Sequence, residues 1–113
     1  MYPIEKLQVW KRAHALAVRV YLLTVPWREF WLRDQVRRAG ASISANIAEG
    51  AGSSSQRELA RYLSIALGSA SELRVLVLLA RDVGLIGGDQ SDSLDAECED
   101  LRRMITSLRK SAR

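Results

Sequence analysis

Residues 29–51 read EFWLRDQVRRAGASISANIAEGA, and this stretch decides the fold. Its apolar side chains recur every three or four positions, which is the spacing of one face of an α-helix, at Leu32, Val36, Ala39, Ile43 and Ile47. A second, polar stripe borders the apolar one and contains Gln35, Arg38, Ser42, Asn46 and Glu49. The stretch therefore predicts a long amphipathic helix that ends near Gly50 and Gly52.

Helical spacing recurs on both sides of this stretch and predicts further helices over about residues 6–24, 55–84 and 91–110. Pro26 ends the first, because the residue before a proline avoids the helical region. Ser55 and Glu58 are spaced as a capping box at the start of the third, and Gly84 follows its end. Strand and hairpin signals do not occur, so we expect one all-α domain spanning residues 1–113, an antiparallel up-down-up-down four-helix bundle.

The spacing also predicts which side chains of the other three helices form the core. The first helix would bury the face that carries Leu7, Trp10, His14, Ala17 and Tyr21. The third would bury Leu59, Leu63, Ala66, Ala70, Leu73, Val77 and Ala80. The fourth would bury Leu94, Cys98, Leu101, Ile105 and Leu108.

Two runs of sequence carry a family resemblance. They are SISANIAEG at residues 42–50 and ALGSASEL at residues 66–73, supported by LQVW at 7–10 and QVRRA at 35–39. In this order and over nearly the whole chain, they resemble the bacterial four-helix-bundle family, also called the ribosomal RNA intervening-sequence proteins. Gly40 and the aromatic segment 27–32 depart from the usual pattern and affect the expected shape of the first loop.

The resemblance implies a bundle that assembles into a cyclic homo-oligomer, usually a pentamer, with no enzymatic activity and no cofactor. Related accessory proteins of diversity-generating retroelements form similar basic pentamers that engage nucleic acid and a protein partner. The expected function is thus a non-enzymatic scaffold for RNA or DNA, with a protein-interaction module as the alternative.

The polar stripe has two interpretations. In the structural one, it forms a buried hydrogen-bond network with the third helix, in which Gly68 permits close approach. That network would contain Gln35, Arg38, Ser42, Asn46, Glu49, Ser69 and Glu72. In the other, Glu49 and Glu72 line a metal or ligand pocket of an enzyme, although the chain has a single His and lacks the Glu-x-x-His motifs of di-iron bundles. We favour the structural interpretation, with no catalytic residue and no metal ligand.

The basic surface is the strongest functional candidate. Residues 1–57 contain nine Lys and Arg against four Asp and Glu, and 14 of the 17 basic residues of the chain are Arg, which suits phosphate binding. The candidate nucleic-acid-binding residues, which would otherwise be an ordinary solvated face, are Lys11, Arg12, Arg19, Arg28, Arg33 and Arg37. The sequence has no helix-turn-helix, RNP or zinc-finger pattern that would read a base sequence, so contacts to the phosphate backbone are expected.

Residues 75–80 are apolar all the way round a helix, which one small bundle cannot bury. This predicts subunit contacts at Val75, Leu76, Leu78 and Leu79. Trp27 and Trp31 would instead dock a partner if the protein is an interaction module. A single cysteine, no apolar run of membrane-spanning length and no signal-peptide pattern favour a cytoplasmic protein without membrane contact.

Overall fold

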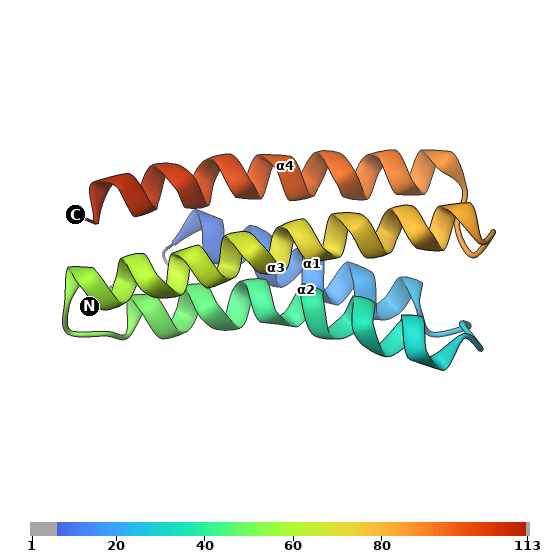
Figure 1. Cartoon of the computed structure of the whole chain (residues 1–113), viewed down its shortest axis with the longest axis horizontal. Helices are drawn as coiled ribbons and strands as arrows, with labels where there is room; N and C mark the ends of the chain where they lie inside the picture. The colour runs from blue at the N-terminus through green and yellow to red at the C-terminus, as the bar shows by residue number, and fades with distance from the viewer. Residues whose placement is uncertain (1–6, 113) are drawn as a thin grey trace.

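The computed structural model describes residues 7–112, which form four helices and, within that range, no strand. The helices are α1 (Gln8–Leu23), α2 (Phe30–Ala51), α3 (Gln56–Asp82) and α4 (Gly88–Ser111). They lie side by side in an elongated body of 43 × 20 × 20 Å (Figure 1). The prediction of an all-α fold with four helices is confirmed, while the predicted start of the first helix at Lys6 lies outside the described residues.

Helix α4 begins at Gly88, before the predicted residue 91. Gly87 is the last extended residue, with φ −81° and ψ 167°, and its carbonyl accepts the first helical hydrogen bond from Ser91 N–H at 3.1 Å. The carboxylate of Asp89 lies in the first turn, where it complements the positive end of the helix dipole. Of the two adjacent glycines only Gly87 lies outside the helix, so the predicted start at residue 91 is three residues late.

Both ends of α3 follow local rules of helix capping. At the start, Ser55 Oγ accepts from Glu58 N–H at 3.0 Å, while the Glu58 carboxylate accepts from Arg61 at 3.2 Å instead of reaching back to Ser55. At the end, Gly84 has φ +84°, and Leu85 N–H donates to the Ala80 carbonyl at 2.9 Å. This is a Schellman motif, which needs a residue that tolerates a left-handed conformation.

The core faces of α2, α3 and α4 are those predicted. Leu32, Val36, Ala39, Ile43 and Ile47 of α2 are at most 4% exposed, and all seven predicted core residues of α3 are buried. In α4 the predicted core residues Leu94, Cys98, Leu101 and Ile105 are buried, and Leu108 packs against the core from its edge.

The predicted core face of α1 is wrong for His14 and Tyr21, whereas Leu7 and Trp10 of that face pack against the edge of the core. The helix buries Val9, Ala13, Leu16 and Val20, whereas Tyr21 is 54% exposed. His14 is exposed as well and stacks on the Trp10 ring at 5.1 Å between centroids. Small residues line the contact between α1 and α2: a Cβ on Gly40 of α2 would lie in ordinary van der Waals contact with Val20 Cγ1, at 3.6 Å, and with the Ala17 Cα, at 3.8 Å.

Helix α3 is long and apolar enough, by length and composition alone, to cross a membrane. One face of α3 fills the centre of the bundle, where Leu63, Ala66, Ala70 and Leu73 are each 0% exposed, while other apolar side chains of the helix, such as Val75, are exposed. A core helix of a compact globular domain has the same composition. The shape of the molecule is therefore compatible with a soluble protein.

Candidate nucleic-acid interface

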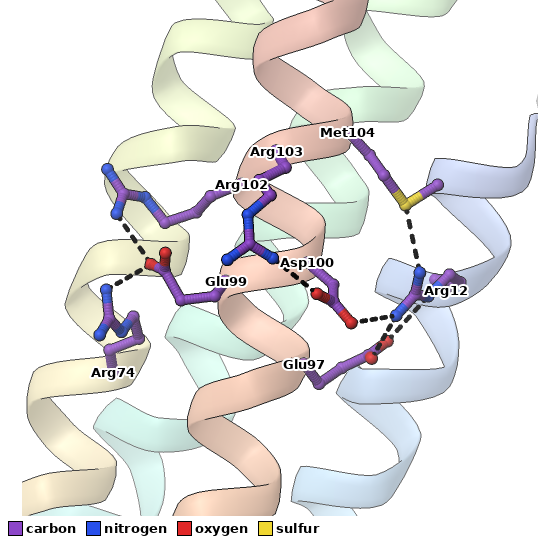
Figure 2. A network of polar contacts seen from close by, with 8 residues as sticks. All are labelled: Arg12, Arg74, Glu97, Glu99, Asp100, Arg102, Arg103 and Met104. Carbon is purple, nitrogen blue, oxygen red and sulfur yellow. Dashed lines mark hydrogen bonds and ion pairs between the residues drawn. The ribbon is translucent and has the colours of Figure 1, made fainter.

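Arg12 is a candidate basic residue whose charge is compensated by carboxylates of α4. Its guanidinium donates to both carboxylate oxygens of Glu97, at 2.6 and 3.2 Å, and to Asp100 at 3.2 Å. It also donates to the Met104 sulfur at 3.4 Å, so that it bridges α1 and α4 (Figure 2). These carboxylates raise the pKa of Arg12, chiefly through the hydrogen bond to Glu97. Arg12 stays 39% exposed, but its charge is compensated by the two carboxylates, so it contributes less to a basic face than the sequence suggests.

Arg74 forms the matching bridge between α3 and α4. It donates to Asp95 Oδ1 at 2.7 Å and to the carboxylate of Glu99, and Arg102 donates to the same Glu99 oxygen at 3.0 Å. Figure 2 shows Arg74 and Arg12 approaching α4 from opposite sides. The acidic half of α4 is thus an internal counter-charge for two other helices as well as a favourable partner of its own dipole.

Three of the predicted arginines form no ion pair within the described residues. Among residues 7–112, the ion pairs involve Arg12, Arg33, Arg38, Arg61, Arg74, Arg81, Arg102 and Arg103, so Arg19, Arg28 and Arg37 form none. Arg19 donates to a neutral partner, Ser93 Oγ, at 2.8 Å, and Arg28 is exposed in the turn between α1 and α2.

Arg37 is held in place by neutral groups. Its Nε donates to Thr24 Oγ1 at 2.8 Å, and its guanidinium lies 3.9 Å from the centroid of the Tyr21 ring. Thr24 in turn donates to the carbonyls at the end of α1, at 2.9 Å for Val20. The fixed guanidinium therefore presents a positive charge at the α1–α2 end of the bundle, which lies at the right in Figure 1.

The last two predicted basic residues differ from each other. Arg33 is paired with Asp34 at 2.9 Å and lies 4.7 Å from the Phe30 centroid, so its charge is partly compensated. Lys11 is exposed and forms no ion pair within the described part of the chain, but it belongs to the opposite half of α1. The six candidates thus do not make one continuous surface.

Sequence reasoning missed a second group of basic residues, at the α2–α3 end. Arg57, Arg109 and Lys110 take part in no ion pair of residues 7–112, and Arg109 donates to Ser64 Oγ at 3.2 Å. Arg109 and Lys110 lie in the last turn of α4, where a basic residue is expected for helix stabilisation alone. The clustering becomes visible only once the C-terminal end of α4 is seen beside the start of α3 (Figure 1).

The predicted polar network between α2 and α3 forms only in part. Ser42 and Ser69 hydroxyls lie 2.7 Å apart, Asn46 donates to Ser42 Oγ at 3.0 Å, and Arg38 donates to Gln35 at 2.9 Å and to both oxygens of Glu72 at 3.2 Å. Glu49 is exposed and takes no part in it.

The burial predicted for this network is wrong in a single chain. The Arg38 and Glu72 side chains are 58% and 44% exposed, and a Cβ on Gly68 would meet nothing within 4 Å. These groups lie on the outward side of the seam between α2 and α3, so Gly68 permits no close approach within the chain.

Two features of the described residues concern metal binding and nucleophilic side chains. No group of three His, Cys, Asp or Glu side chains converges in residues 7–112 on a point that could hold a metal ion. Burial raises the pKa of the Cys98 thiol to about 12 from its usual 9.0, which keeps it protonated and unreactive.

The predicted subunit-contact residues differ in their exposure. Val75, Leu78 and Leu79 are 66%, 45% and 39% exposed, whereas Leu76 packs partly against the core. Trp27 is only 6% exposed, so its prediction as an exposed docking residue is wrong, because the turn after Pro26 folds its ring into the core. Trp31 is 65% exposed and borders a hollow of about 470 Å³ shared with Leu79 and Val83.

Comparison with known proteins agrees with this architecture. The sequence model of the 23S rRNA-intervening sequence proteins matches residues 5–107. A crystal structure of a protein of unknown function, from the S23 ribosomal protein family of Bacteroides thetaiotaomicron, superposes with a TM-score of 0.84 at 28% identity, covering 90% of this chain and 98% of that one. Comparison with curated protein sequences finds no significant match. The chain belongs to the family of 23S rRNA-intervening sequence proteins.

Proposed function

We propose that this protein is a non-enzymatic, homo-oligomeric scaffold that binds the backbone of RNA or DNA. The observation that carries the proposal is the set of three arginines, Arg19, Arg28 and Arg37, which form no ion pair with any carboxylate of residues 7–112. Guanidinium groups of this kind bind phosphate through paired hydrogen bonds. Family membership adds weight, since the family is named for intervening sequences of 23S rRNA.

Two contacts support antiparallel packing of α2 and α3. Ser42 contacts Ser69 and Arg38 contacts Glu72, so the residue number falls on one helix as it rises on the other.

Assembly would multiply the positive charge of one chain. The exposed apolar residues Val75, Leu78 and Leu79 would meet a neighbouring copy in a closed ring. At +4 per chain, a pentamer would carry a net charge of about +20, and phosphate affinity grows with the number of contacts.

The chemistry of the reactive side chains supports a non-enzymatic role in the cytoplasm. The Cys98 thiol is buried and protonated, and the imidazole of His14 lies on the surface against Trp10. A nucleophile and a base within reach of one another would be needed for covalent catalysis. A single buried thiol is also typical of a protein kept in a reducing compartment.

The test compares two triple variants that change net charge equally. Arg19→Gln, Arg28→Gln and Arg37→Gln together remove the charges that form no ion pair, whereas Arg61→Gln, Arg81→Gln and Arg103→Gln remove charges that surface carboxylates already compensate. Gel-shift titration of RNA and DNA at several salt concentrations should show weaker binding and a salt slope lower by up to about three for the first variant. The second variant should lose much less.

Equal losses in the two triple variants would contradict the proposed interface, and no shift even at low salt would contradict nucleic-acid binding itself. The second outcome would favour a protein-interaction module, for which the exposed Trp31 ring beside the apolar hollow is the specific observation.

A further inference from the structure

An aromatic–guanidinium ladder runs along the α1–α2 end of the bundle. Phe30, Arg33 and Arg37 lie on one face of α2, because positions three and four apart on a helix are neighbours. Arg33 lies over the Phe30 ring at 4.7 Å, and Arg37 lies over the Tyr21 ring of α1 at 3.9 Å. The ladder is therefore Phe30, Arg33, Arg37 and Tyr21, in that order.

The ladder is rigid but open to solvent. The hydrogen bonds of Arg37 to Thr24 and of Arg33 to Asp34, both under 3.0 Å, fix the two guanidinium groups on their rings. The rings remain 54% exposed at Tyr21 and 57% exposed at Phe30. Exposed aromatic rings cost free energy in water, and here they are held in place rather than turned into the core.

From this geometry we propose that the ladder stacks the unpaired bases of single-stranded RNA or DNA. The inference rests on the proposed function and specifies its ligand. Flat rings and flat guanidinium groups stack on nucleobases regardless of sequence, while the charge of Arg37 and of the neighbouring Arg28 binds the phosphates between them. A duplex hides its base faces and offers only phosphates to the same site.

The charges around the ladder favour a strand over a membrane. Burying this end in a lipid surface would desolvate the carboxylates of Asp34, whose side chain is 63% exposed, and of Glu29, which is also exposed. A single strand leaves those carboxylates in water, because a base covers only the ring on which it stacks.

The experiment measures fluorescence anisotropy of three labelled ligands with the full-length protein at low salt. They are a single strand of about a dozen nucleotides, an abasic strand of the same length and a duplex. We expect the strand with bases to bind roughly five- to hundredfold more tightly than the abasic strand. Phe30→Ala and, separately, Tyr21→Ala should remove most of that difference, while Tyr21→Phe should retain it. Leu22→Ala is the matched control, because Leu22 is 64% exposed in the same turn region but lies outside the ladder.

The possible results separate the two proposals. Equal affinity for the strand with bases and the abasic strand would overturn base stacking while leaving backbone binding intact. No binding of any of the three ligands would overturn both proposals. If Phe30→Ala instead weakens binding to phosphatidylserine vesicles, or changes the oligomeric mass, without affecting the strand, the ladder serves a membrane or a second copy and the inference is wrong.

Discussion

Two glycines of identical appearance in the sequence have opposite surroundings. A Cβ on Gly50 would lie 3.0 Å from Leu59 Cδ1 and 3.1 Å from Tyr62 Cβ, whereas a Cβ on Gly68 would meet nothing within 4 Å. We expect Gly50→Ala to lower the free energy of unfolding by about 1–3 kcal/mol through overpacking. Gly68→Ala should raise it by about 0.5–1 kcal/mol, because alanine is the better helix former. Urea denaturation followed by circular dichroism measures both, and a destabilised Gly68→Ala protein would mean that a partner copy packs on this position.

The sequence could not distinguish these roles. The predicted end of α2 near Gly50 and Gly52 is confirmed, since the helix ends at Ala51 and Gly52 caps it. The close approach predicted at Gly68 is found at Gly50 instead. Which glycine faces a neighbouring helix depends on the rotation and axial shift of two helices, and neither quantity is written in one segment. By contrast, Gly84 was predicted correctly as a helix-ending residue, because the requirement for φ +84° is local.

Helix α4 depends on salt bridges to its neighbours, and these provide a prediction at the scale of one element. Arg74→Met keeps the aliphatic stem but leaves Asp95 and Glu99 without that partner. We expect a loss of about 1 kcal/mol, because the Arg74 side chain is only 34% exposed and contacts two carboxylates. The matched control, Arg103→Met, removes one pair whose arginine is 71% exposed and should cost below about 0.5 kcal/mol. Equal urea midpoints for the two variants would show that the bridge does not stabilise α4.

Hydrophobic periodicity predicted the core of three helices but not of α1. In α2 and α4 the aliphatic residues fall mainly on one stripe, and in α3 one such stripe runs the length of the helix although residues 75–80 are apolar all round. Helix α1 has two apolar stripes, and the large rings of Trp10 and Tyr21 led to the prediction that their stripe forms the core. Close packing favours the stripe of Ala13 and Val20, since Val20 lies directly against Gly40 of α2.

The candidate site, too, could be predicted only in part from the sequence, because it depends on how the whole molecule is arranged. Composition alone indicated excess positive charge in the first half of the chain, and the structure shows which part of it is cancelled. Arg12 and Arg19 are two turns apart on one helix, yet one meets the carboxylates of α4 and the other meets only Ser93. The difference arises from the register between α1 and α4, which no local pattern specifies.

The exposed apolar side of α3 predicts that copies of the whole molecule assemble through this helix. Leu78 and Val18 are each 45% exposed, but Leu78 lies beside Val75 and Leu79 on α3, whereas Val18 lies on α1. If copies join through α3, Leu78→Glu buries a charge in the interface and should give monomers or aggregates in light scattering, while Val18→Glu leaves the assembled mass unchanged. An unchanged mass for Leu78→Glu would place the interface elsewhere. Dissociation by Val18→Glu instead would assign it to α1, beside the hollow that Val18 shares with Leu22 and Gln90.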